Sequence, residues 1–137
     1  MIERKLPDWL DGYMDFTDES EPPRLFKLWS GISAIASALQ RQCHLMWDAN
    51  LGELFYPNLF VLLVGPSGCR KGTAMRPARG VHKSAGIECV ADATTKEAWI
   101  RNVAESRLEV PNEVGEMISH CSVTVHSEEF TVFIGYD

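Results

Sequence analysis

Residues 59–73 read LFVLLVGPSGCRKGT and join an apolar run to a glycine-rich turn. The run Leu59–Val64 has the length of a strand and no polar residue, which is typical of a strand buried on both faces in a parallel sheet. Gly65 and Gly68 follow at once, and glycine allows backbone turns that other residues resist. We therefore predict a buried strand, a tight loop and then a helix that begins near residue 71.

The loop keeps most of the phosphate-binding pattern G-x-x-x-x-G-K-[ST]. Gly65 and Lys71 stand at the spacing that the pattern requires. Backbone N–H groups of such a loop point at phosphate oxygens, the helix N-terminus adds a positive dipole end, and the lysine adds a charge. The predicted nucleotide-binding residues are Gly65, Pro66, Ser67, Gly68, Cys69, Arg70, Lys71, Gly72 and Thr73. The alternative is a chance glycine-rich turn after an apolar segment.

Two positions depart from the pattern. Arg70 replaces the glycine before the lysine, so the backbone there must be helical, and its side chain is then free to meet a phosphate. Gly72 replaces the hydroxyl residue that binds Mg²⁺, but Thr73 keeps a hydroxyl one position later, and we expect the metal to be held through water. The sequence Lys-Gly-Thr also occurs in the loops of adenylate kinase-like enzymes, which leaves a phosphotransferase open.

An acidic pair follows a second apolar segment. Residues 122–126 predict a strand, and Glu128 and Glu129 come directly after it. In P-loop enzymes of the additional-strand class, the first such acid orients Mg²⁺ and the second polarises the attacking water. We therefore assign Glu128, with Thr73, to the metal and Glu129, with Lys71, to catalysis. The alternative is a solvated turn. His126 is either a sensor of the γ-phosphate or a buried packing residue.

The remaining pattern predicts an α/β chain. We expect helices over about 7–19, 23–42, 71–84 and 94–108. The third should be kinked or broken near Met75–Pro77, and a capping box of Thr94 and Glu97 opens the last. Strands are expected at 59–64, 87–91 and 122–126, with extended segments at 43–48 and 53–57. Asp92, Thr94 and Thr95 either cap the last helix or face a ligand. Alternating helices and strands indicate a largely parallel sheet.

Composition restricts the class of protein. The 137 residues are 45% hydrophobic and 23% charged, with a net charge of −6, as in a soluble globular protein and unlike a generic nucleic-acid-coating protein. No apolar stretch would span a bilayer, and the four cysteines are too dispersed for a disulfide framework, so we expect a reduced cytoplasmic protein. The adjacent pairs Cys43-His44 and His120-Cys121 are a weaker metal-site alternative. Residues 54–87 carry only basic charges, which suits a polyanion such as a nucleotide or a solvated basic face.

Four segments resemble the P-loop ATPases of phages and prophages related to the helicase half of primase–helicases. They are LFKLWSGISAIASALQRQ, YPNLFVLLVGPSGCRKGTA, ADATTKEAWIRNVAES and VTVHSEEFTVFIG, in that order. The resemblance implies a three-layer, RecA-like fold of the additional-strand class, with ATP and Mg²⁺ as cofactors. It also implies homo-oligomeric rings and a role on single-stranded DNA in a bacterial or phage-infected cell.

The same resemblance assigns parts of the chain. Residues 1–50 would be an N-terminal helical segment, and 51–137 the first part of an ATPase domain that is incomplete at its C-terminus. Lys71 and Thr73 would contact phosphate, while Glu128 and Glu129 would serve metal and water. Because later strands and an arginine finger are absent, we expect this chain alone not to hydrolyse ATP. A phosphotransferase and a non-hydrolysing nucleotide-binding adaptor are the alternatives.

Overall fold

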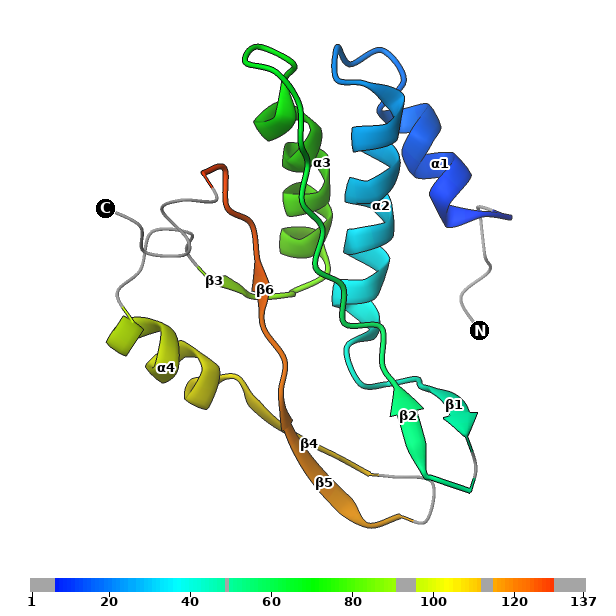
Figure 1. The fold of residues 1–137 in the computed structure, drawn as a ribbon, viewed down its shortest axis with the longest axis vertical. Helices are drawn as coiled ribbons and strands as arrows, with labels where there is room; N and C mark the ends of the chain where they lie inside the picture. Colours follow the sequence, from blue (N-terminus) through cyan, green and yellow to red (C-terminus); the bar gives the residue numbers. More distant parts are fainter. Residues whose placement is uncertain (1–6, 49, 91–95, 112–114, 130–137) are drawn as a thin grey trace.

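The computed structural model describes residues 7–48, 50–90, 96–111 and 115–129 (Figure 1). Its helices are α1 (Trp9–Phe16), α2 (Arg24–Leu39), α3 (Lys71–Ser84) and α4 (Lys96–Glu105). Its strands are β1 (Leu45–Asp48), β2 (Glu53–Phe55), β3 (Cys89–Val90), β4 (Arg107–Pro111), β5 (Met117–Cys121) and β6 (Thr124–Val125). None of the described helices has both the length and the apolar character that crossing a bilayer requires.

The buried core of the described residues lies among α1, α2 and α3. Helix α2 packs against both α1 and α3 and so stands between them in Figure 1. Most of its buried apolar residues are alanines, whose small size lets helix backbones approach closely. The buried apolar residues are Tyr13, Ala34, Ala36, Ala74 and Ala78. Since α2 and α3 lie on opposite sides of the predicted division at residue 50, the two predicted parts share one core.

Side-chain contacts fix where α1 begins and ends. The carboxylate of Asp8 accepts hydrogen bonds from the backbone N–H groups of Leu10 at 2.8 Å and Asp11 at 3.0 Å, which caps the first turn. At the other end, the buried ammonium group of Lys27 donates to the carbonyl oxygens of Thr17, Asp18 and Ser20 at 3.0, 3.2 and 3.4 Å. A positive group at a helix C-terminus is favourable, so Lys27 ties α2 to α1.

The strands form three separate two-stranded sheets. Strands β1 and β2 pair antiparallel, as do β4 and β5, whereas β3 and β6 pair parallel. In the parallel pair Cys89 lies opposite Thr124 and Val90 opposite Val125. The chain continues from β6 toward the N-terminal end of α3 (Figure 1), and this direction determines where the acidic pair lies.

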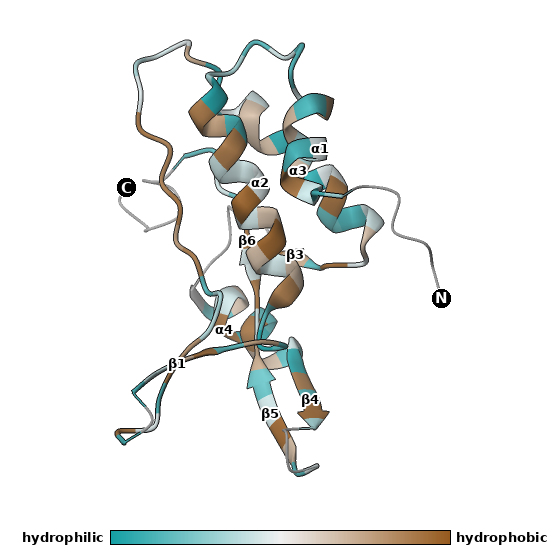
Figure 2. Cartoon of the chain, turned by 90° about the vertical axis from the view of Figure 1, so that its right-hand side faces the viewer, coloured by the Kyte–Doolittle hydropathy of each residue, from teal (hydrophilic) through white to brown (hydrophobic). Residues whose placement is uncertain are grey.

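The apolar run Leu59–Val64 does not form the buried strand that we predicted. It is extended, but it pairs with no described strand. Phe60 is 76% exposed and Val64 is 77% exposed, so the run is not covered on both faces. A strand is defined by a ladder of hydrogen bonds to a neighbouring strand, and the run belongs to none of the sheets of the described residues. Figure 2 shows the run as an apolar trace beside α2 that ends at the loop.

The helices follow the predictions more closely. The predicted helix at 23–42 is α2, the one at 7–19 is the shorter α1, and the one at 94–108 is α4, which ends at Glu105. The expected break near Met75–Pro77 is wrong, because α3 continues through Pro77. Thr94 of the capping box, and the Asp92, Thr94 and Thr95 group, lie outside the described residues.

Among the strands, the predictions at 87–91 and 122–126 correspond to β3 and β6, and the extended segments at 43–48 and 53–57 correspond to the β1–β2 hairpin. The β4–β5 hairpin was not predicted. The described residues contain helices and three small sheets, of which one is parallel. The three-layer, largely parallel fold therefore stays a prediction.

Candidate functional site

The loop between Gly65 and Lys71 turns through two residues with positive φ. Gly68 has φ +81°, and Arg70 has φ 60° and ψ 35°. The helical backbone expected at Arg70 is thus left-handed, the region in which glycine is favoured. The general phosphate-binding pattern has a glycine at this position. Arg70 therefore takes the backbone conformation that the pattern's glycine would take, at a cost of about 1 kcal/mol.

The side chain of Lys71 folds back over this loop. Its Nζ donates to the carbonyl oxygens of Gly65 at 2.8 Å and Pro66 at 3.1 Å, and it lies 3.7 Å from Sγ of Cys69. These contacts hold the ammonium group at the mouth of the loop rather than in solvent. Because they are neutral acceptors, an anion at the loop would compete with them effectively for the charge.

The N-terminus of α3 offers unpaired backbone donors next to this charge. The helix begins at Lys71, and no side chain caps it. Within the described part of the chain, the N–H groups of Lys71 and Gly72 donate to no hydrogen-bond acceptor. Such groups, with the positive end of the helix dipole, favour an anion. Arg70 is turned outward, where its Nε lies 2.7 Å from Oε2 of Glu21 in an exposed ion pair.

Glu128 lies directly against this helix terminus. A Cβ atom placed on Gly72 would be 3.3 Å from both Cδ and Oε2 of Glu128. One carboxylate oxygen of Glu128 is also 3.9 Å from a guanidinium nitrogen of Arg79, farther along α3. Two predicted site residues that are 56 positions apart are thus neighbours in space. The carboxylate occupies the space into which a side chain at position 72 would project.

The predicted roles of Thr73 at the metal and of Glu129 in catalysis have less support from geometry. Thr73 is half-buried in the first turn of α3, one residue from Gly72. Glu129 is exposed, and its backbone carbonyl accepts a hydrogen bond from Oγ of Ser127 at 2.9 Å. No contact recorded for the described residues joins the Glu129 carboxylate to the loop. Its assignment as the catalytic base stays a prediction.

A largely apolar cavity of about 440 Å³ opens beside the loop lysine. It lies between α2, the extended run 59–63, the start of α3 and the segment 123–128. The side chains that bring polarity or aromatic surface to it include Trp29, Lys71, Trp99, His126 and Glu128. Its volume is within the range of small-molecule pockets, about 300–1,000 Å³.

At His126 this cavity adjoins a cluster of three potential metal-binding side chains, the one such cluster found among the described residues. His82, Cys89 and His126 each offer one ligand atom, and the three atoms lie within 4.8 Å of one another. Burial lowers the pKa of His126 to about 4, helped by the nearby His82 and Arg79. Burial also lowers the pKa of His82, while a backbone interaction with Ala34 raises it by less. Both imidazoles are therefore neutral at pH 7.

This cluster was missed from the sequence, apart from His126. The buried position predicted as one alternative for His126 is confirmed, because it is 7% exposed and its Nε2 lies 2.9 Å from Nδ1 of His82. The pairs Cys43-His44 and His120-Cys121 form no such cluster among the described residues. One sequence signal could have indicated that His82 and Cys89 lie close together. Gly86, between them, has φ +70° and turns the chain from α3 into β3.

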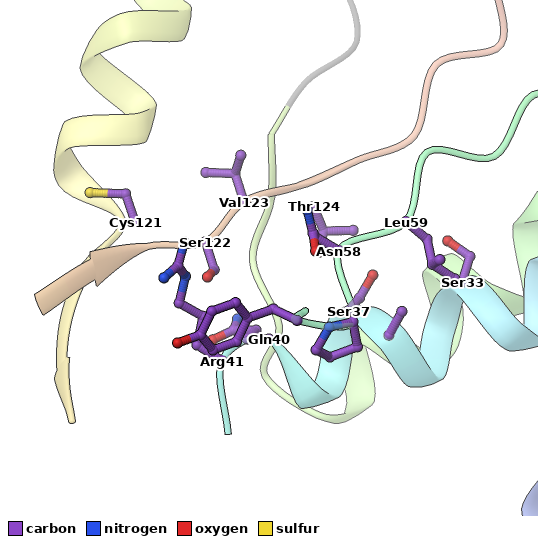
Figure 3. Close-up of a pocket in the computed structure, with 13 residues that line it drawn as sticks. Ser33, Ser37, Gln40, Arg41, Asn58, Leu59, Cys121, Ser122, Val123 and Thr124 are labelled. Carbon is purple, nitrogen blue, oxygen red and sulfur yellow. The ribbon is translucent and has the colours of Figure 1, made fainter. Parts of the chain in front are cut away.

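A second cavity of about 350 Å³ lies at the C-terminal end of α2 (Figure 3), whereas the loop lies near the opposite end of that helix (Figure 1). Hydroxyl side chains from α2 and from the segment 121–124 line it, together with the amides of Gln40 and Asn58. Arg41 at its edge stacks over the ring of Tyr56, with Cζ 4.4 Å from the ring centroid. The cavity does not include a residue of the phosphate-binding loop.

The loop, the lysine, the helix terminus and Glu128 form the only predicted site whose members the described residues bring together. Comparisons of the chain with protein-family models, with curated proteins and with solved structures found no match.

Proposed function

We propose that this chain binds a nucleoside triphosphate with Mg²⁺ through residues 65–73, as the ATP-binding module of a phage-type DNA replication ATPase. One observation carries the proposal: Glu128 meets Gly72, the residue after Lys71, and both Glu128 and Lys71 line the same cavity. If the glycine-rich turn had arisen by chance, no carboxylate distant in sequence would be expected at the N-terminus of the helix that follows it. A carboxylate next to a helix N-terminus that begins with a lysine suits a phosphate–metal pair, and the 52% exposure of the Glu128 side chain leaves it open to an incoming ligand.

The phosphates would bind to the free amides of Lys71 and Gly72 and to the loop backbone. Lys71 would leave the carbonyls of Gly65 and Pro66 and pair with phosphate oxygens, a stronger, charge-assisted interaction. The loop has a left-handed backbone at Arg70, where the binding pattern has a glycine, and this supports the proposal. Little reorganisation is then required beyond the lysine side chain.

Mg²⁺ would lie between the phosphates and Glu128. The usual hydroxyl residue is missing at position 72, and the Glu128 carboxylate occupies the space that it would fill. Mg²⁺ prefers oxygen ligands and commonly uses one or two carboxylates, phosphate oxygens and several waters. Glu128 thus compensates for the glycine, and Thr73 would act through a water molecule.

Nucleotide binding is tested by calorimetric titration of the full chain with Mg-ATP. Lys71→Ala should weaken binding at least about tenfold, because it removes a charge-assisted contact of about 1.5–3 kcal/mol. Lys83→Ala is the matched control, since Lys83 is an exposed lysine in the last turn of the same helix. Equal affinities of the wild type and Lys71→Ala would refute the proposal.

The role of Glu128 is separable from that of Lys71. Glu128→Gln keeps the shape of the side chain but removes its charge, so it should abolish the gain in ATP affinity that Mg²⁺ gives to the wild type. ATP affinity measured in a chelator should stay the same. If Mg²⁺ strengthens binding equally in both proteins, the metal is held elsewhere.

Turnover and action on single-stranded DNA are further parts of the proposal. An oligomer with DNA-stimulated hydrolysis would support the motor, and Glu129→Gln should then stop turnover without weakening binding. The exposed position of Glu129 favours a second candidate, a nucleotide-binding adaptor without hydrolysis. Binding of ATP with no phosphate release, with or without DNA and in longer versions of the chain, would select the adaptor.

A further inference from the structure

The histidine–cysteine cluster joins three elements that are distant in sequence. His82 lies in the last turn of α3, Cys89 begins β3, and His126 follows β6. Nδ1 of His82 lies 2.9 Å from Nε2 of His126 and 3.7 Å from Sγ of Cys89. His82 is 0% exposed and His126 is 7% exposed, so both imidazoles are held by packing rather than by solvent.

These distances are close to those of a zinc site. Zn–N bonds of about 2.0–2.1 Å and Zn–S bonds of about 2.3 Å put two nitrogens about 3.3 Å apart and a nitrogen and a sulfur about 3.6 Å apart in a tetrahedron. The two separations that involve Nδ1 of His82 differ from these by a few tenths of an ångström, and Sγ of Cys89 lies within 4.8 Å of Nε2 of His126. Such adjustments are within the reach of side-chain rotations in His126 and Cys89.

The donor set also suits zinc. Imidazole nitrogen and thiolate sulfur bind zinc well, whereas magnesium and calcium prefer oxygen ligands. Nε2 of His82 is buried without a hydrogen-bond partner among the described residues, so the 2.9 Å contact alone does not satisfy this ring.

We propose that His82 Nδ1, Cys89 Sγ and His126 Nε2 form a Zn²⁺ site, with a water or other small ligand at the fourth position. On binding, the Cys89 thiol loses its proton to solvent and the thiolate sulfur bonds to the metal. The hydrogen shared by the two imidazoles moves to the other nitrogen of its own ring. No oxidant or reductant is needed, because the metal stays Zn²⁺ throughout.

The site has a mechanical consequence for the loop helix. It fixes the end of α3 to β3 and to the segment that leads from His126 to Glu128. The position of Glu128 against Gly72 depends on how these elements sit relative to one another. The metal would thus hold these elements in place without contacting the nucleotide. The zinc proposal does not depend on the nucleotide proposal.

Cobalt substitution gives a direct test on the full chain. Protein stripped with a chelator is titrated with Co²⁺ alone, and absorption is followed for thiolate-to-cobalt charge transfer and the intense visible bands of tetrahedral cobalt. We expect both to saturate at one Co²⁺ per chain and to disappear when Zn²⁺ is added. Absence of the charge-transfer band would overturn the site.

Variants identify the sulfur. Cys89→Ser should remove the charge-transfer band and weaken Zn²⁺ binding at least about tenfold, and Cys89 is exposed enough for the fold to tolerate the change. Cys43→Ser and Cys121→Ser, at two other exposed cysteines, should leave both readouts unchanged. A band that survives Cys89→Ser or is lost in either control variant would contradict the assignment. His126→Gln, checked by circular dichroism for a retained fold, should also weaken Zn²⁺ binding, and unchanged affinity in folded protein would equally refute it.

Discussion

Two glycine-to-alanine changes in different helices should move stability in opposite directions. Gly31 lies in α2 where α1 crosses it, and a Cβ atom there would be 2.7 Å from Cδ1 of Tyr13 and 2.9 Å from Cδ1 of Leu10. Carbon atoms pack best about 3.5–4.0 Å apart, so the methyl group would overlap its neighbours by about 1 Å. Tyr13 is buried and stacks on Trp9 with ring centroids 5.3 Å apart, so it cannot simply rotate away.

The expected magnitude combines two terms. Overpacking of this kind costs about 1–3 kcal/mol. Alanine gains about 0.5–1 kcal/mol over glycine inside a helix. The middle of these two ranges gives a net loss in the free energy of unfolding of about 1 kcal/mol for Gly31→Ala. Gly80→Ala in α3 meets no atom within 4 Å, so it keeps only the helix gain and should raise the same quantity by about 0.5–1 kcal/mol.

Urea denaturation followed by tryptophan fluorescence and circular dichroism measures both values, and parallel transitions by the two probes justify a two-state treatment. The difference between the two variants is the informative quantity, because the chemical change is identical. If Gly31→Ala is as stable as the wild type, α1 does not pack on α2 as closely as described. If both variants gain stability equally, the reasoning from contact distance fails.

Three more predictions concern other contacts. Lys27→Met keeps the aliphatic stem but leaves three carbonyls at the end of α1 without their shared donor. Urea denaturation should therefore show a free energy of unfolding lower by about 2 kcal/mol or more. A change below about 0.5 kcal/mol, the size of a typical surface substitution, would mean that the ammonium group is solvated instead. Arg70→Gly should raise the free energy of unfolding by about 1 kcal/mol, because glycine adopts the left-handed backbone without strain and only an exposed ion pair is lost. A clear loss of stability would indicate that the ion pair with Glu21 contributes more than its exposure suggests. Burial raises the pKa of Tyr13 to about 12, so the folded state keeps a proton that the unfolded chain loses near pH 10. The free energy of unfolding should therefore fall by about 3 kcal/mol between pH 10 and 12. Tyr13→Phe should flatten that part of the pH profile, and an equal decline in the variant would place the titration elsewhere.

Local patterns in the sequence predicted local structure well. The three- and four-residue spacing of apolar residues was sufficient to predict the helix α2, but not which face it buries. Its buried residues are Lys27, Ser30, Gly31, Ala34 and Ala36, whereas Leu25 is 60% exposed and Trp29 is 41% exposed. The loop at Gly65–Lys71 was also recognisable, since glycines and a lysine at fixed spacing specify a backbone path over a few residues. Pro77 was misjudged because its missing N–H affects a single hydrogen bond, which packing of α3 against α2 outweighs.

Features that depend on distant residues were less accessible. Leu59–Val64 has the composition of a buried strand, but pairing requires a neighbour, and sequence alone does not say whether one is present. The contact of Glu128 with Gly72 was expected only from a resemblance. The meeting of His82, Cys89 and His126 was not anticipated, because it depends on the register of a two-residue parallel pairing between β3 and β6.

The extended run beside α2 has a practical consequence for anyone who handles the protein. Six consecutive apolar residues without charge or proline, with backbone groups that no described strand occupies, are a template for pairing with the same run of another molecule. Such pairing grows with concentration, and no charged residue lies within the run itself to oppose it, since the nearest charges in sequence are at Glu53 and Arg70. Clouding of concentrated samples would then report on this segment while the helices remain folded.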